Sequence, residues 1–433
     1  MSKHKIHHAN IKEWAANYEG ELFDAILCDP PYELGFMGKS WDSSGIAFDT
    51  EMWADLFKLL KPGGHLLAFS GSRTYHRMAV AIEDAGFEIR DMIEWVYGSG
   101  FPKSLNIGKA VDKIQGNERE YIGEKLTGGI KRPPKALKSS DTYDDTRTHN
   151  YTTGQTMVSD TKGNSPYEGY GTALKPAHEP ICLARKPIDG TVANNVLKHG
   201  TGGLNIDGTR VGTGTGEVKT YKVVDMRGGN YGQDKEAYSD RPKLERTTVD
   251  TGRFPANLIH DGSDEVEAVF PQTKNGGGNS TSKRETWLRQ ETEPTQYAGD
   301  KGSASRFFYT AKASKSERNA GLEGFEPVIR NDGRNTELAS GHMPQNRSNT
   351  PKANHHPTVK PLSLTKYLAT LIKPPTGGRI LVPFSGSGSE MIGALQAGWG
   401  YVEGVELTEE YIPIAEARLA HWIDHEKSWT PQT

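Results

Sequence analysis

The chain has 433 residues, of which 34% are hydrophobic and 25% charged, and its formal net charge of −3 gives no overall basic signature of a nucleic-acid-binding protein. This length allows one large domain or two to three ordinary ones. The sequence has no run of about 18 apolar residues, which predicts no transmembrane helix, and its first residues lack the apolar core of a signal peptide. Two cysteines, Cys28 and Cys182, form no CxxC pair and no disulfide framework, which favours a reducing cytoplasm.

The first 110 residues alternate between strand and helix patterns. Residues 50–64 carry apolar side chains at three- and four-residue steps and end in Pro62-Gly63-Gly64, which is typical of a helix followed by a stop signal. The apolar run 25–28 predicts a strand that is buried on both faces. The elements expected here are helices at 10–18, 50–64 and 75–87, and strands at 24–28, 65–70 and 89–97.

The C-terminal part of the chain returns to the same alternation. The expected elements are helices at 362–372, 389–399 and 409–423, and strands at 378–384 and 400–407. Strand and helix in alternation predict an α/β fold with a doubly wound, mostly parallel sheet.

The middle of the chain, residues 111–350, is rich in Gly, Thr, Asn, Asp and Lys. Long stretches such as 138–156 lack apolar periodicity and predict loops. Strand-like islands lie at 179–187, 202–211 and 254–261. Residues 98–140 contain nine Lys or Arg and four Asp or Glu, whereas residues 383–429 contain two Lys or Arg and eight Asp or Glu. A basic middle predicts an anionic partner for this part, with a merely solvated surface as the alternative.

Residues 380–398 have the pattern of a strand, a glycine-containing turn and a helix. Gly386 and Gly388 let the backbone approach a ligand closely, and the helix N-terminus after them presents unpaired N–H groups. Glu406 ends the next strand about 20 residues later, where an acid can accept hydrogen bonds from ribose hydroxyls. Because the full G-x-G-x-x-G pattern is missing, an adenosine-containing ligand without a pyrophosphate is favoured. A turn without a ligand, and a surface glutamate near a helix cap, are the alternatives.

The strand at 24–28 ends in Asp29-Pro30-Pro31-Tyr32. Since proline restricts the residue before it to extended geometry, the Asp29 side chain and the Pro30 carbonyl are fixed at the carboxyl end of the strand, where α/β sheets place ligands. Both groups accept hydrogen bonds, which suits an –NH2 group, and Tyr32 offers a flat face for stacking. Two fixed acceptors can localise the lone pair of an exocyclic base amine for direct attack, without a covalent enzyme intermediate.

Asp29-Pro30-Pro31-Tyr32 together with the turn at 384–388 resembles the DNA amino-methyltransferases that depend on S-adenosylmethionine (SAM) and modify N6 of adenine or N4 of cytosine. The catalytic motif comes first, then a long middle segment, then the cofactor motif, an order similar to the circularly permuted β group of this family. Residues 59–72 and 355–372 also match. Residues 98–106 and 178–187 are similar to phage and prophage members.

The resemblance implies three parts of a Rossmann-like methyltransferase fold with a seven-stranded sheet. Residues 1–110 would form the catalytic half, residues 111–350 a target-recognition and DNA-binding insertion, and residues 351–433 the cofactor-binding half. The implied partner is double-stranded DNA, in bacterial or phage-infected cytoplasm and without membrane contact. A homodimer and a restriction enzyme partner stay open.

The resemblance also implies roles for single residues. Asp29 and Pro30 would hold the target amine, with Pro31 in the same catalytic motif, and Tyr32 would stack on a flipped-out base. Further substrate contacts are implied for Phe101, Lys39 and Trp41. The implied cofactor site binds SAM and no metal, and it comprises Phe384, Ser385, Gly386, Ser387, Gly388, Glu406, His356 and Lys360. For His356, an ordinary loop histidine is the alternative.

The leading function is methyl transfer to N6 of adenine, because aspartate at the first motif position leans toward adenine within the family. N4 of cytosine, and more distantly RNA or a protein amide, are alternative targets. Val382 stands where the family commonly has an aspartate that contacts the cofactor's ammonium, so a nucleic-acid-binding relative without catalysis is another alternative. The histidine clusters at 4–8 and 355–356 lack metal-ligand spacing, and the first is expected in a mobile N-terminus.

Overall fold

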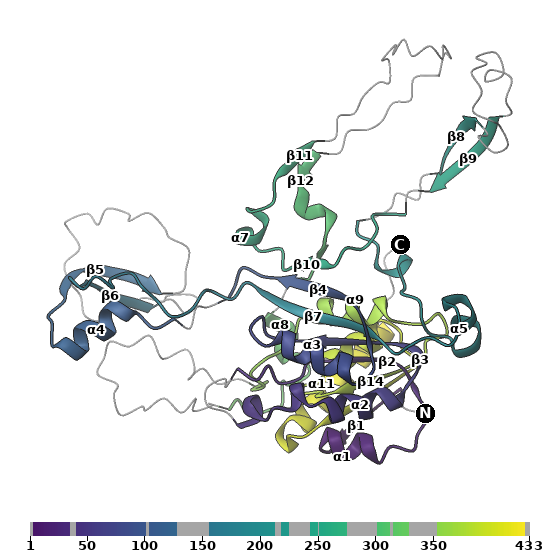
Figure 1. Ribbon diagram of the computed structural model, residues 1–433, viewed down its shortest axis with the longest axis horizontal. Helices are drawn as coiled ribbons and strands as arrows, with labels where there is room; N and C mark the ends of the chain where they lie inside the picture. Colours follow the sequence, from purple (N-terminus) through teal and green to yellow (C-terminus); the bar gives the residue numbers. More distant parts are fainter. Residues whose placement is uncertain are drawn as a thin grey trace, which may run out of the picture.

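A computed structural model shows one central sheet flanked by helices, from which three hairpin-containing excursions extend (Figure 1). The residues that the structure describes are 3–34, 40–100, 104–127, 156–212, 218–224, 243–249, 251–274, 301–311, 315–328 and 353–428.

The central sheet contains nine strands. In spatial order they are β1 (His4–His8), β15 (Tyr401–Glu406), β14 (Arg379–Pro383), β2 (Phe23–Cys28), β3 (Leu60–Phe69), β7 (His178–Arg185), β4 (Glu88–Val96), β10 (Leu258–His260) and β13 (Tyr309–Thr310). Only β7 runs antiparallel to its neighbours in this sheet, and all other pairs are parallel. The mostly parallel α/β fold is therefore confirmed, while the implied seven strands become nine because β10 and β13 extend the sheet beyond β4.

Helices cover both faces of this sheet, which explains why strand β2 is apolar from Ala25 to Cys28. Its residues Ala25 and Leu27 pack into the cluster that includes residues of α9 (Leu362–Leu371) and α10 (Ser389–Gln396). Its residues Ile26 and Cys28 pack into a second cluster with residues of α1 (Ile11–Ala16), α2 (Thr50–Leu59) and α3 (Tyr75–Asp84). Successive side chains of a strand point to opposite faces, so a strand buried on both sides is apolar on both. The buried exception, Asp24, pairs with Lys61 at 2.7 Å.

The predicted elements differ from the structure in three places. The histidine-rich segment 4–8 is not a mobile N-terminus but strand β1, which pairs with β15 along its whole length. Strand β3 begins at Leu60 rather than at residue 65, so the Pro-Gly-Gly signal ends helix α2 but lies within the following strand. The island 202–211 is not a strand: it contains the short helix η4 (Asp207–Thr209) and a single bridge from Val211.

The middle of the chain contributes directly to the central sheet. Strand β7 lies between β3 and β4, and β10 and β13 extend the edge, so residues 111–350 are not separate from the catalytic sheet. Their role in target recognition stays a prediction. The other described elements are α5 (Val192–His199), α7 (Asp264–Glu267), α8 (Lys315–Asn319), α11 (Ile412–Ser428), β8 (Val218–Val224), β9 (Lys243–Val249), β11 (Gln272–Lys274), β12 (Lys301–Ser303), η2 (Ser40–Ser43), η3 (Ile46–Phe48), η5 (Ala304–Phe307) and η7 (Glu409–Tyr411).

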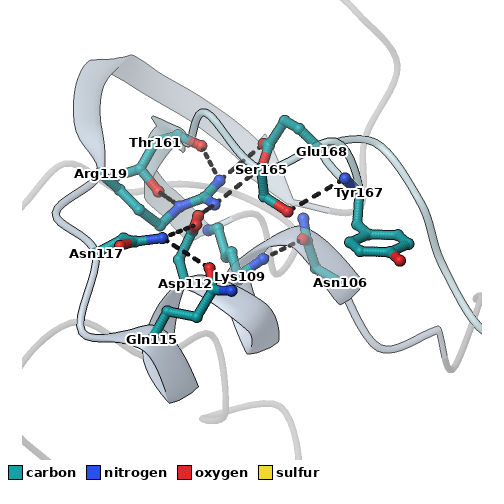
Figure 2. A network of polar contacts seen from close by, with 10 residues as sticks. All are labelled: Asn106, Lys109, Asp112, Gln115, Asn117, Arg119, Thr161, Ser165, Tyr167 and Glu168. Carbon is teal, nitrogen blue, oxygen red and sulfur yellow. Dashed lines mark hydrogen bonds and ion pairs between the residues drawn. The ribbon is translucent and has the colours of Figure 1, made fainter.

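One excursion, which we call the arm, comprises α4 (Ile107–Gln115), β5 (Glu120–Thr127), β6 (Thr156–Lys162) and the loop through Glu168. Figure 2 shows that Arg119 connects its parts. Its guanidinium pairs with Asp112 of α4, donates to Glu168 Oε1 at 2.7 Å and donates to the Thr161 carbonyl at 2.8 Å. A planar donor fork of this kind can hold several acceptors in fixed geometry, so Arg119 joins α4, β6 and the loop that follows β6.

Candidate active site

A cavity of about 290 Å³ lies at the carboxyl ends of β2, β14 and β15, three neighbouring parallel strands. This is the edge at which parallel α/β sheets bind ligands. Predicted site residues that line the cavity are Asp29, Pro30, Pro31, Tyr32, His356, Lys360, Phe384, Ser385, Gly386, Ser387 and Glu406. The fold thus brings together two motifs that are about 350 residues apart in the sequence.

The Asp29 carboxylate lies directly after β2 and is held by a buried lysine. Lys360 Nζ donates to Asp29 Oδ2 at 2.6 Å and lies 3.4 Å from Glu179 Oε2. Burial lowers the pKa of the Lys360 ammonium, but attraction by Asp29 and Glu179 outweighs it and raises the pKa above its ordinary value. The other oxygen, Asp29 Oδ1, is buried and has no hydrogen-bond partner among the described residues. A buried acceptor without a donor is costly unless a ligand supplies one.

Tyr32 is fixed at both its hydroxyl and its backbone. The hydroxyl donates to Glu179 Oε2 at 2.8 Å, while the carbonyl accepts a hydrogen bond from Thr74 Oγ1 at 2.7 Å. The next residue, Glu33, has φ of 55°, and its N–H donates to Asp42 Oδ1 at 3.0 Å. These contacts hold the chain after the two prolines, so the tyrosine ring has a defined position beside Asp29.

The glycine turn after β14 has three residues in the left-handed region. Phe384 has φ of 62°, Gly386 of 52° and Gly388 of 82°. A Cβ at Gly386 would lie only 2.7 Å from His356 Nε2, so this position accepts glycine alone. Its N–H donates to Glu406 Oε2 at 2.7 Å. The turn is therefore held against the end of β15, with its backbone facing the cavity.

Glu406 has both carboxylate oxygens engaged by backbone donors, from Gly386 and, at 2.8 Å, from Thr408. Burial raises its pKa, although these N–H donors oppose the shift. Each carboxylate oxygen has a second lone pair, so the predicted contact with a ribose is compatible with this geometry. The alternative of a surface glutamate does not fit, because Glu406 is buried.

Two predicted cofactor residues have partners that the sequence does not indicate. His356 Nδ1 interacts with the Thr358 carbonyl, and the ring packs edge-on against Tyr411 with centroids 4.6 Å apart. It forms a wall of the cavity behind Gly386. Lys360, whose implied role is in the cofactor site, lines the cavity and forms an ion pair with Asp29.

The predicted substrate contacts fall mostly outside the described part of the chain. Phe101 and Lys39 lie outside the described residues. Trp41 lies in η2, but its side chain is also outside the description. Their roles stay predictions.

Sequence reasoning misses Arg418, which supports the glycine turn from behind. This fully buried residue of α11 donates from Nη1 to the Ser387 carbonyl at 2.6 Å and to Ser389 Oγ at 3.1 Å. Burial lowers its pKa to about 10, so the guanidinium remains charged at neutral pH. Its position in a long amphipathic helix gives no sequence signal for this contact.

Val382 is fully buried in β14 and packs in the cluster that contains Met391 and Ile392 of α10. The side chain at this position therefore adds no charge to the cavity. A different acid, Glu390, lines the cavity from the first turn of α10. The sequence prediction overlooks it because it lies beyond the glycines of the motif.

Neither a metal centre nor a membrane-spanning helix is found among the described residues. No group of three or more His, Cys, Asp or Glu side chains there is arranged to bind a metal ion. None of the described helices combines the length and apolar character needed to cross a membrane.

Comparisons with known proteins agree with the two motifs. The family described as DNA methylase (N6/N4 methyltransferases) matches residues 23–417. Type II methyltransferase M.HindIII of Haemophilus influenzae is 25% identical over 159 residues, which are 36% of this chain and 37% of that protein. The putative methylase YubD of Escherichia coli is 42% identical over 66 residues, which are 15% of this chain and 28% of that protein. The matched stretches thus span well under half of these relatives.

Solved structures show more distant similarity. The M1.HpyAVI–SAM complex has a TM-score of 0.38 at 14% identity, covering 96% of this chain and 98% of that one. The cytosine-N4-specific PvuII DNA methyltransferase has a TM-score of 0.42 at 11% identity, covering 96% and 86%. Similarity at this level indicates no substrate. The family match spans most of the sequence and includes both the Asp-Pro-Pro-Tyr motif and the glycine turn, and the chain therefore belongs to the DNA methylase family of N6/N4 methyltransferases.

Proposed function

We propose that the protein transfers a methyl group from SAM to N6 of adenine in DNA. The observation that carries this proposal is the buried oxygen Asp29 Oδ1, which has no donor among the described residues and lies in the same cavity as the glycine turn. An acceptor of this kind fits a hydrogen of an exocyclic amine. Family membership supports the reaction class.

The cavity residues fit SAM in two respects. Gly386 presents backbone without a Cβ to the cavity, and Glu406 lies at the neighbouring strand end with lone pairs for ribose hydroxyls. When bound there, SAM supplies a methyl group on a positively charged sulfur. The chain's own part is to bind and orient this molecule, and no protein nucleophile is required.

Asp29 and the Pro30 carbonyl orient the target amine. They accept its two hydrogens and so favour a tetrahedral nitrogen whose lone pair points at the methyl group. A bond forms between nitrogen and the methyl carbon, the carbon–sulfur bond breaks with its electron pair going to sulfur, and the surplus amine proton leaves along the hydrogen bond to Asp29. Lys360 keeps this carboxylate in place through its other oxygen.

The choice of adenine rests on the aspartate at position 29, and N4 of cytosine is the alternative target. To distinguish them, the full chain is incubated with labelled SAM and plasmid DNA, and methylated bases are then mapped by single-molecule sequencing. We expect N6-methyladenine at one recurring sequence. Methyl groups on cytosine N4 would refute the adenine assignment, and unmethylated DNA would refute the enzymatic one.

We also propose that the middle of the chain contacts DNA and that the arm is part of this surface. The support is the basic stretch 98–140, part of which forms α4, because lysine and arginine neutralise phosphates and can offset the cost of base extrusion.

Arg119→Leu should loosen the arm, since it leaves the buried Asp112 and the half-buried Glu168 without their cation. We expect DNA affinity to fall about tenfold or more, because several phosphate contacts are lost together, while affinity for SAM stays unchanged. Fluorescence anisotropy with a labelled duplex measures the first and calorimetry the second. Arg90→Leu, which removes an exposed arginine on β4, is the matched control. Unchanged DNA affinity in Arg119→Leu, with exchange of arm amides accelerated, would exclude the arm from the DNA surface.

A further inference from the structure

Glu390 is a buried carboxylate without a counter-charge of its own. It is the second residue of α10, directly after the glycine turn, and it is 4% exposed and lines the cavity. Among the described residues it has no ion pair with a lysine, arginine or histidine, and its only hydrogen-bond donor is its own backbone N–H. Burying an unpaired carboxylate is costly, so a fold that keeps one needs either a proton or a cation at that place.

The nearby cations are already committed to other groups. Lys360 pairs with Asp29 and Glu179, and Arg418 binds backbone and hydroxyl oxygens of the glycine turn. Burial and the charge of Asp29 raise the pKa of Glu390 to about 7, although Lys360 and Arg418 attract its ionised form. The carboxylate is thus poised to lose its proton when a further cation arrives.

The cavity as a whole has an excess of negative charge. Its charged lining residues are one lysine, Lys360, and four acids, Asp29, Asp42, Glu390 and Glu406. Asp29 pairs with Lys360, Asp42 accepts a hydrogen bond from the Glu33 N–H, and Glu406 accepts from two backbone N–H groups. Among the described residues, this leaves Glu390 as the acid of the cavity without a partner outside its own backbone. SAM carries a cationic ammonium on its methionine portion, and Val382 offers nothing to bind it.

We propose that Glu390 is the residue that binds the ammonium of the methionine portion of SAM, so that the acid missing at position 382 is supplied from the first turn of α10. This inference rests on the proposed function. The two positions lie on adjoining elements, β14 and α10, on either side of the glycine turn. Moving the acid across the turn keeps a carboxylate at the cavity while position 382 stays apolar and joins the core.

The test compares two uncharged-sulfur ligands that share the adenosine part. S-adenosylhomocysteine carries the ammonium and carboxylate of the amino acid, whereas 5′-methylthioadenosine lacks both. In calorimetry with the full chain, Glu390→Gln should weaken S-adenosylhomocysteine binding by about 10- to 100-fold, the loss expected for a charge-assisted hydrogen bond, and leave 5′-methylthioadenosine binding unchanged. Wild-type affinity for S-adenosylhomocysteine should rise as pH increases through about 7, because Glu390 must be ionised, and the variant should lack this dependence.

Two further variants sharpen the comparison. Glu403→Gln changes a buried glutamate outside the cavity that pairs with Arg379, and it should leave both affinities unchanged. Glu390→Asp keeps the carboxylate on a shorter side chain and should retain part of the preference for S-adenosylhomocysteine. Equal weakening of both ligands by Glu390→Gln, or no weakening of either, would overturn the inference while the proposed function stands. Wild-type protein that binds neither ligand would overturn the proposed function itself.

Discussion

Asp29→Ala should reduce methyl transfer to DNA by at least about 10³-fold, because it removes the acceptor that we propose holds the target amine in the transition state. The cofactor side should be preserved, since Asp29 lies after β2 whereas the turn and Glu406 lie after β14 and β15. The fold should also persist, because Lys360 keeps Glu179 as a partner at 3.4 Å. Single-turnover transfer of labelled methyl groups measures the first effect, and calorimetry with SAM measures the second.

A second effect distinguishes this variant from a merely damaged protein. The charge of Asp29 is one cause of the raised pKa of Glu390, so its removal should lower that pKa. Binding of SAM at pH 6 should then be tighter in Asp29→Ala than in the wild type. The exposed Asp84→Ala on α3 serves as control and should change neither quantity. Loss of SAM binding together with transfer would mean that Asp29 binds the cofactor and that the two motifs have been assigned the wrong roles.

Local sequence patterns predict the regular part of the fold well. The predictions of strand β2 and of helices α2 and α9 are confirmed. Each of these elements has ten residues or fewer, and the spacing of its apolar residues shows directly which side chains are buried. Strand β1 shows the limit of this logic. Its sequence His4–His8 has little apolar character, and it becomes a strand because the exposed edge of β15 offers a full set of backbone partners.

The composition of the site is predicted, but its internal contacts are not. The two prolines after β2 show where the backbone is restricted, and the two glycines after β14 show where it is unusually free. Residues of both the Asp-Pro-Pro-Tyr motif and the glycine turn line the cavity. The pairing of Lys360 with Asp29 joins residues 331 positions apart, so only the packed sheet creates it. The sequence does not predict the contributions of Arg418 and Glu390 to the site, because each lies in an ordinary helical pattern. Only the structure shows that both charged side chains are buried, which is rare unless they have a partner or a ligand.

Lys360→Met tests whether the stability of the fold and methyl transfer depend on the ammonium group of Lys360 in the cavity. The methionine fills a similar volume but leaves the partly buried carboxylates of Asp29 and Glu179 without their cation, so we expect a loss of about 3–5 kcal/mol in the free energy of unfolding at pH 8. Transfer activity should also be lost, since Asp29 no longer has a partner that fixes its orientation. Urea denaturation and single-turnover assays measure the two effects. Lys58→Met, at a lysine 71% exposed on α2, should cost at most about 0.5 kcal/mol.

The pH dependence of this stability loss gives a sharper test, and its sign follows from the direction of the shifts. Lys360 lowers the pKa of Glu390 against the larger effects of burial and of Asp29, so without the ammonium the pKa of Glu390 must rise further above its unfolded value. An acid whose pKa is raised in the folded state stabilises the fold as it takes up a proton, and this contribution grows as pH falls through the folded pKa. The deficit of Lys360→Met relative to the wild type should therefore shrink between pH 8 and pH 5.5.

Lys360→Arg keeps the charge and should show little of this dependence. The Nζ of Lys360 also lies over the rings of Tyr32 and Phe69, at 5.2 and 4.9 Å from their centroids. A stability deficit that is the same at both pH values would mean that Lys360 stabilises the fold through these ring contacts and not by neutralising the carboxylates.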